Sequence, residues 1–253
     1  MGYQTVSKLA AHYKKSKEWI KKQLDDYDLP AHRIKPRKVV VIADAMFFGR
    51  HQGTLVFRNA HKKENIYWDH IEHESIFVYQ RGVRTLQEAG CEVQALVIDG
   101  KKGVKEAFPN IPIQMCQFHQ WQIVKRYLTT KPKLEASKEL HVIARKLSNS
   151  TEKDFTLLLD RWFKKWEWFL KERTMNLETG RKQFTHKRLR SAYFSLRRNL
   201  PYLFTYERYP ELNIPKTTNG LEGVFSHVKT VVRVHRGLKK TRRQKLINFL
   251  LRQ

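Results

Sequence analysis

The stretch KVVVIAD, residues 38–44, is a continuous apolar run that ends in a carboxylate. Such a run, without alternation of polar and apolar residues, is typical of a strand buried on both faces of a sheet. A turn at 49–53 separates it from two further stretches of strand character, TLVFRNA at 54–60 and ENIYWDHIEHES at 64–75. The sequence therefore predicts a sheet whose first strand ends at Asp44.

Helix and strand alternate after these three strands. Residues 75–89 carry apolar side chains at helical spacing. The next three segments predict a strand that ends at Asp99, a short helix and a fifth strand: CEVQALVID (91–99), KGVKEAF (102–108) and IPIQMC (111–116). An order of three strands, helix, strand, helix and strand predicts an α/β fold with an RNase H-like mixed sheet.

The strand signals stop after Cys116, and residues 129–214 are expected to form an all-helical insertion. Its segment RWFKKWEWFLKER places Trp162, Trp166 and Phe169 on one helical face, which favours core packing. Trp168 lies off that face and is a candidate for stacking on a DNA base. Sheet character is not expected to return after the insertion.

Two short amphipathic segments precede the sheet. In the second, Ser16 can cap a helix that carries Trp19, Ile20 and Leu24 at helical spacing. This pattern resembles a DNA-binding helix-turn-helix, although an ordinary helical hairpin is the alternative. The side chains expected to face DNA are Lys17, Lys21 and Lys22.

The predicted organisation has five parts. They are a helix-turn-helix-like segment (1–28), a linker (29–37), the first part of the RNase H-like core (38–128), the all-helical insertion (129–214), and a closing helix with a basic tail (215–253).

Basic residues greatly outnumber acidic ones. Fifty Lys and Arg stand against 24 Asp and Glu, a formal net charge of +26. This excess predicts a polyanionic partner, for which double-stranded DNA is the default. No apolar stretch is long enough to span a bilayer and no signal peptide is evident, so a membrane partner is not expected. Two cysteines, Cys91 and Cys116, cannot form a disulfide framework, which favours a reducing cytoplasm.

Three acidic residues are candidates for chemistry. Asp44 and Asp99 end predicted strands, and Glu222 opens a helix in TTNGLEGVFSHVKT, residues 217–230. If they converge, their mutual repulsion requires a cation, and carboxylate oxygens suit Mg²⁺ or Mn²⁺. Each also has a structural interpretation: the aspartates as turn formers, and Glu222 as the partner of Asn219 in a capping box.

Three stretches together carry a resemblance to a known family. They are VVVIADAMFFG (39–49), LVIDGKKGVKEAFPNIPIQMCQFHQWQIVKR (96–126) and TTNGLEGVFSHVK (217–229). In this order they resemble the DDE transposases of bacterial insertion sequences of the Mutator-like superclade. The resemblance covers roughly residues 38–240.

The resemblance implies an activity and its residues. Asp44, Asp99 and Glu222 would be catalytic and would hold two Mg²⁺ or Mn²⁺ ions, with Cys116 and His119 of a C-x-x-H motif and Asn219 near the site. The implied reaction is cleavage of transposon ends followed by strand transfer from the freed 3′-hydroxyl, by a homodimer or larger assembly bound to transposon ends and target DNA. The implied location is the bacterial cytoplasm, on the nucleoid. The alternatives are an RNase H-like nuclease without strand transfer and an inactive DNA-binding regulator.

Two further patterns have competing interpretations. Cys116 and His119 are half of a zinc site, but a packed thiol with a hydrogen-bonded histidine is favoured. His70, Glu72 and Glu74 would share one face of a strand and could bind metal, although an exposed polar face is favoured.

The helix after Asn219 is expected to have one buried and one basic stripe. The buried stripe is Leu221, Val224, Phe225, Val228, Val231 and Val232, and the neighbouring stripe is Glu222, Ser226, Lys229 and Arg233. Lys229 and Arg233 are therefore candidates for DNA phosphate contacts, the alternative being a solvated polar face.

Overall fold

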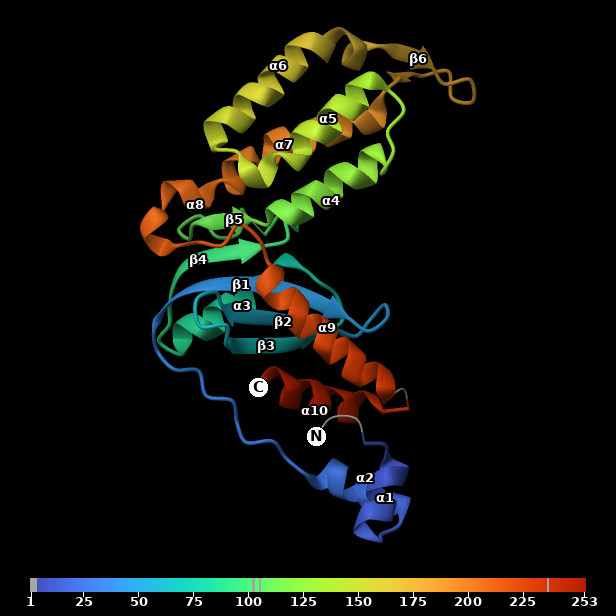
Figure 1. The fold of residues 1–253 in the computed structure, drawn as a ribbon. Coiled ribbons are helices and arrows are strands. Elements are labelled where there is room, and N and C mark those ends of the chain that lie inside the picture. Colours follow the sequence, from blue (N-terminus) through green and yellow to red (C-terminus); the bar gives the residue numbers. More distant parts are fainter. Residues whose placement is uncertain (1–3, 102, 105, 236) are drawn as a thin grey trace. The chain divides into compact units, whose positions relative to one another are not determined.

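The computed structural model describes residues 4–101, 103–104, 106–235 and 237–253 (Figure 1). The protein is α/β, and its strands have both parallel and antiparallel neighbours, so its sheet is mixed. The chain divides into two compact units: unit 1 holds residues 1–92 and 219–253, and unit 2 holds residues 93–218. Of the helices in the described ranges, none combines the length and apolar character that a membrane crossing requires.

Unit 1 contains three antiparallel strands, β1 (Lys38–Phe47), β2 (Gly53–Asn59) and β3 (Asn65–Ile71). The prediction that β1 ends at Asp44 is wrong, because the strand continues for three residues. The Asp44 backbone pairs with Val56, and Met46 further along is buried. A single half-buried carboxylate does not stop a strand whose backbone still has a partner on the neighbouring strand.

Helices cover both faces of these strands. Helix α3 (Ile76–Glu88) lies on one face, where Gly82 lets the helix approach the Phe57 ring so closely that an added Cβ would be 2.1 Å from a ring carbon. Helix α9 (Asn219–Val234) contacts β1 on the other face, where a Cβ on Gly220 would be 3.2 Å from the Ile42 side chain. Because side chains alternate along a strand, Asp44 faces the α9 side, as Ile42 does.

Helix α10 (Lys240–Leu251) packs beside α9 in unit 1. Its Asn248 Oδ1 accepts a hydrogen bond of 2.9 Å from Trp68 Nε1 on β3. Trp68 pairs with Val56, which in turn pairs with Asp44, so α10 covers the same sheet face as α9. The predicted basic tail is therefore largely a helix that belongs to the packing of unit 1.

The N-terminal helices α1 (Val6–Tyr13) and α2 (Lys17–Asp26) form as predicted, and Ser16 caps α2. Lys14 stands in the turn where glycine is usual and has φ +50°. Within the described part of these helices only Ile20 is buried. Trp19 and Leu24 are each more than 40% exposed, so the expected apolar stripe covers no large core.

Unit 2 contains the parallel pair β4 (Glu92–Ile98) and β5 (Ile113–Met115). The described residues of the segment between them do not form the predicted short helix. Val104 and Ala107 instead belong to successive turns, while Lys102 and Lys105 lie outside the described residues. The cause is local: Gly103 adopts φ +85°, a left-handed conformation that interrupts a right-handed helix.

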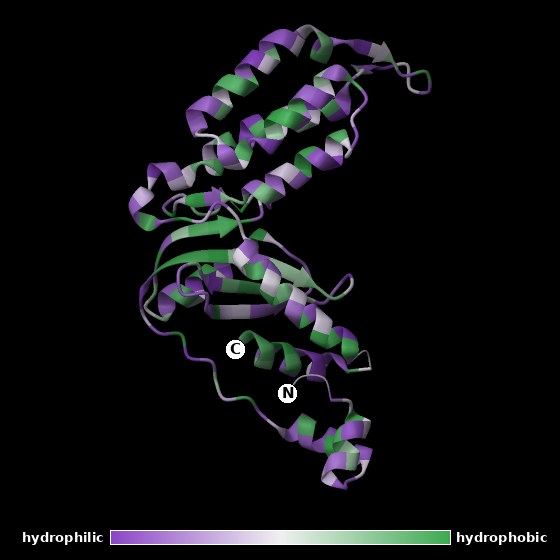
Figure 2. Cartoon of the chain, viewed as in Figure 1, coloured by the Kyte–Doolittle hydropathy of each residue, from purple (hydrophilic) through white to green (hydrophobic). Residues whose placement is uncertain are grey.

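The rest of unit 2 is mainly helical. Its helices are α4 (Gln117–Leu128), α5 (Glu135–Arg145), α6 (Glu152–Lys171), α7 (Lys187–Leu203) and the short α8 (Thr205–Arg208), with 3₁₀ turns at Leu147–Asn149 and Pro210–Leu212. Figure 2 shows apolar and polar residues alternating along α5, α6 and α7, as expected for helices that share a core.

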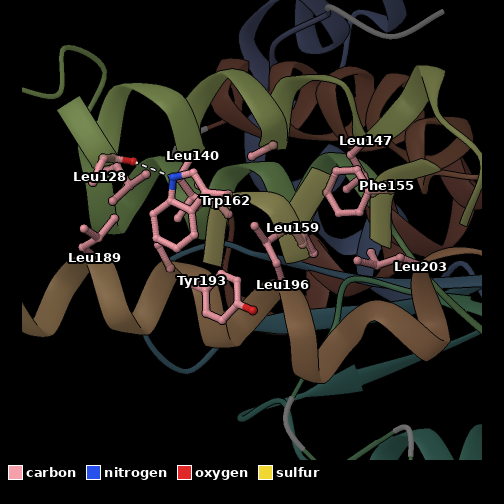
Figure 3. Close-up of a cluster of buried hydrophobic side chains, with 14 of the residues drawn as sticks. Leu128, Leu140, Leu147, Phe155, Leu159, Trp162, Leu189, Tyr193, Leu196 and Leu203 are labelled. Atoms are coloured by element: carbon pink, nitrogen blue, oxygen red, sulfur yellow. Dashed lines mark hydrogen bonds between the residues drawn. The ribbon is translucent and has the colours of Figure 1, made fainter. Parts of the chain in front are cut away.

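The core of unit 2 confirms the interpretation of the tryptophans. Trp162 is buried among leucines of α4, α5 and α7, and its Nε1 donates a 3.0 Å hydrogen bond to the Ala136 carbonyl (Figure 3). Trp166 and Phe169 are partly buried against the same cluster. Trp168 is 63% exposed, as its position off this face predicts.

The prediction of an all-helical insertion is wrong at one place. Strands β6 (Arg173–Met175) and β7 (Lys182–Phe184) form an antiparallel hairpin between α6 and α7. The Asn176 side chain accepts hydrogen bonds from the backbone N–H groups of Glu178 and Thr179, and Gly180 has φ +63°. Asparagine and glycine at these places are a turn signal that helical periodicity on either side concealed.

Candidate functional site

Asp44 lies on β1, on the face that α9 covers. Its side chain is half-buried, and its Oδ1 accepts a 2.8 Å hydrogen bond from the N–H of Ala45. The first turn of α9 reaches the same face at Ile42, two residues before Asp44. Unit 1 thus brings the sequence-distant segments that carry Asp44 and Glu222 against each other.

Glu222 lies in the first turn of α9 and is exposed. The helix begins at Asn219, so Thr218, and not Asn219, occupies the position that precedes the first turn. The buried stripe of α9 is confirmed except at Val224, which is only half-buried. Because the apolar stripe fixes the rotation of the helix, Glu222 is kept out of the core and remains available to a ligand.

Asp99 follows β4 directly, in unit 2, as the sequence predicts for the end of that strand. It is half-buried, and its Oδ1 accepts a 2.9 Å hydrogen bond from the backbone N–H of Lys101. Gly100, between them, has φ +94°. Asp99 therefore does form a turn, and this bond leaves its second carboxylate oxygen to other partners.

The three carboxylates are chemically suited to Mg²⁺ or Mn²⁺, which prefer hard oxygen ligands. Asp44 and Glu222 belong to unit 1, and Asp99 belongs to unit 2. Among the residues that the structure describes, no group of three or more His, Cys, Asp and Glu side chains is arranged to hold a metal ion.

Cys116 and His119 form a hydrogen-bonded cluster with Thr218 inside unit 2. Cys116 and Thr218 are fully buried, and the Thr218 N–H donates to Cys116 Sγ at 3.3 Å. The Thr218 Oγ1 lies 3.5 Å from His119 Nδ1. Burial acts to raise the pKa of the Cys116 thiol, but hydrogen bonds from His119 and Thr218 outweigh it and lower that pKa. A packed thiol beside a hydrogen-bonded histidine is therefore what the C-x-x-H motif forms here.

His70, Glu72 and Glu74 do not share a strand face, because β3 ends at Ile71 and only His70 belongs to the strand. His70 Nε2 lies 2.8 Å from Asn248 Oδ1, and its Nδ1 lies 3.1 Å from Thr54 Oγ1. Glu72 pairs with Lys240 at 3.6 Å, and Glu74 accepts a hydrogen bond from a tyrosine hydroxyl. Each group has a protein partner, so the segment is a structural one.

Acidification should destabilise unit 1 through His70. Burial lowers the pKa of His70, against the opposing effects of its hydrogen bond with Asn248 and of the Asp69 carboxylate. As the pH falls through the ordinary pKa of histidine, His70 therefore takes up a proton in the unfolded chain before it does so in the folded protein. Proton uptake by the unfolded chain favours unfolding, so the folded protein is at its full stability above that pKa and loses stability below it. We expect the thermal midpoint to fall between about pH 7.5 and about pH 5.5, and to fall less in the His70→Gln variant. Equal slopes in the two proteins would contradict the assignment to His70.

The residues predicted to contact DNA are all on the surface. Lys17, Lys21 and Lys22 of α2, Trp168 of α6, and Lys229 and Arg233 of α9 are exposed. Their contact with DNA stays a prediction.

A basic and aromatic group around β7 and α7 was missed. Arg173 and Arg190 both lie over the ring of Phe184, and Arg190 also lies over Phe194. The signal was present in the sequence as the alternation of basic and aromatic residues in KQFTHKRLRSAYFSLRR, residues 182–198. It was not recognised because the hairpin that brings Arg173 to Phe184 was not predicted.

Neither a scan against models of known protein families nor a search of curated proteins finds a match to this chain.

Proposed function

We propose that the protein is a DNA transposase of the DDE type, with an RNase H-like core. One observation carries the proposal most strongly: the first turn of α9, which bears Glu222, packs on the face of β1 that bears Asp44. The order along the chain of three antiparallel strands, a helix, and two mutually parallel strands fits an RNase H-like core. The net charge of +26 fits a DNA partner.

In this proposal Asp44, Asp99 and Glu222 act as ligands of two divalent cations. Such cations, when bound, lower the pKa of a nucleophilic water or 3′-hydroxyl and stabilise the leaving oxygen of a phosphodiester. Asp44 and Asp99 accept hydrogen bonds from the backbone N–H groups of Ala45 and Lys101, and these bonds restrict the direction of both carboxylates. Fixed ligands need no rearrangement when substrate binds, which is the protein's contribution to catalysis.

Exposed basic residues supply the DNA contacts. Lys229 and Arg233 follow Glu222 at seven and eleven positions, so they lie on the same face of α9, about 10 and 16 Å further along the helix axis. There they can hold phosphates further along the bound DNA. Strand transfer joins two ends, and we therefore propose a homodimer or larger assembly on DNA. The proposed place of action is the bacterial cytoplasm.

The proposal is tested by incubating the purified chain with Mg²⁺ and duplexes that carry candidate terminal repeats, together with a target plasmid. Cleavage at the repeat followed by joining to the target is the expected result. Cleavage without joining would identify an RNase H-like nuclease instead. A mobility shift with neither reaction, across Mg²⁺ and Mn²⁺, would contradict an enzyme and favour an inactive DNA-binding regulator.

A further inference from the structure

Two adjoining hollows open on unit 2 between α6, the β6–β7 hairpin and α7. Their volumes are about 430 and 450 Å³, and both are lined by Phe184, Arg190 and Phe194. Arg173 lines one of them, and Lys187 and Arg198 line the other. We call these six residues together the arginine–phenylalanine groove.

Guanidinium groups and aromatic rings alternate along the groove. The Arg190 guanidinium lies 3.6 Å from the centre of the Phe184 ring and 5.2 Å from that of Phe194, and Arg173 lies 4.3 Å from Phe184. Arg190 Nη1 also donates a 2.8 Å hydrogen bond to the Leu170 carbonyl. Arg190 is thus held in place, so little side-chain entropy remains to be lost when a flat ligand stacks there.

The charge of the groove is strongly positive. Its lining includes four basic side chains, those of Arg173, Lys187, Arg190 and Arg198. Among the described residues that line it, Glu167 is the only one with a carboxylate. Glu167 is itself paired with Lys171 at 2.7 Å. A groove with this excess of positive charge attracts a polyanion, and its aromatic rings and guanidinium planes add a surface for flat groups.

We propose that the arginine–phenylalanine groove binds an unpaired stretch of DNA, with bases stacked on Phe194 and on the guanidinium plane of Arg190 that lies over Phe184, and with phosphates held by the other basic side chains of the groove. A duplex would offer this groove only phosphates, because its bases are stacked on each other and cannot reach the rings. A single strand offers both phosphates and free base faces, and basic grooves interleaved with aromatic rings are the usual solution for single strands. The inference rests on the proposed DNA partner but does not require the carboxylates or any cation.

The test measures binding of the full chain to a fluorescent oligothymidine and to a labelled duplex of equal length by anisotropy, in EDTA. The Phe184→Leu/Phe194→Leu variant keeps apolar side chains but removes both aromatic faces. We expect it to lose about tenfold or more in affinity for the single strand, the scale of stacking on aromatic side chains, with duplex binding nearly unchanged. Equal losses for both DNA forms, or no loss, would overturn the proposal.

A charge variant and a matched control complete the test. Arg173→Gln/Arg198→Gln changes two exposed side chains. It should make the salt dependence of single-strand binding less steep by about 1.4 in the log–log slope, or 0.7 for each lost phosphate contact. Lys153→Gln/Arg161→Gln removes the same charge from exposed positions of α6 outside the groove and should leave that slope unchanged. If the control changes the slope equally, the effect is one of net charge and the groove is not the site. Because no cleavage occurs in EDTA, the outcome is independent of whether the chain is a transposase.

Discussion

Replacing Asp99 by asparagine is expected to abolish strand cleavage while DNA binding persists. Asparagine has nearly the same shape as aspartate, and its amide oxygen can still accept the hydrogen bond from the Lys101 N–H, so the turn after β4 should be retained. It lacks the negative charge with which a carboxylate offsets the charge of a bound divalent cation, so the ion is held much more weakly. Cleavage should fall on the order of 10³-fold or more, as when a group that stabilises only the transition state is lost. Gel assays of Mg²⁺-dependent cleavage and anisotropy of duplex binding measure the two properties separately.

The matched control is Asp160→Asn, which removes the charge of an exposed carboxylate that pairs with the half-buried Arg197 in unit 2. It should leave cleavage within about twofold of the wild-type rate, since surface ion pairs contribute little. Asp44→Asn and Glu222→Gln should each be as severe as Asp99→Asn, and combining them should cost little more, because groups that act as one unit are not additive. Full cleavage by the Asp99→Asn variant would refute the proposed site.

Much of the fold follows from the sequence because hydrophobic periodicity reports burial. The run at 39–43 is buried throughout in β1, and the stripe of α9 is buried at five of its six predicted positions. The secondary-structure predictions fail where the backbone conformation of one or two residues decides between a helix and a turn. Gly103 at φ +85° prevents a helix that the residue types around it favour, and Asn176 with Gly180 turns a chain that otherwise has helical periodicity. The residue type makes such a turn more favourable but does not determine it, because the packing of neighbouring segments decides between turn and helix.

The candidate site is predictable only in part, for a different reason. Sequence places Asp99 after a strand and Glu222 near the start of a helix, and both placements are confirmed. It placed Asp44 at a strand end, whereas its strand-pairing partner Val56 keeps it inside β1. Which face of β1 receives α9 depends on the contact between Gly220 and Ile42, and no local pattern in either segment encodes that pairing. The groove residues were missed for the same reason, since Arg173 and Phe184 meet only through the pairing of β6 with β7.

Replacing Phe155 by alanine should destabilise unit 2 more than any surface change. Phe155 is fully buried in the helical core (Figure 3). Its ring lies 5.8 Å from that of Phe204. The substitution removes apolar contacts and leaves a cavity, which costs about 3–5 kcal/mol of unfolding free energy at a well-packed site. Leu157→Ala, at a 47% exposed position of the same helix, should cost less than about 1 kcal/mol.

Urea unfolding followed by tryptophan fluorescence is the suitable measurement, because Trp121, Trp162, Trp166 and Trp168 lie in unit 2 and only Trp19 and Trp68 lie in unit 1. The transition of the Phe155→Ala variant should move to lower urea with an unchanged slope, since the surface exposed on unfolding is nearly the same. Circular dichroism of the whole chain should then show a second transition, from unit 1, that the substitution does not shift. A shift of both transitions together would mean that the two units unfold as one cooperative body. A Phe155→Ala loss no larger than that of Leu157→Ala would contradict a shared core of α5, α6 and α7, and with it the rigid support on which the arginine–phenylalanine groove depends.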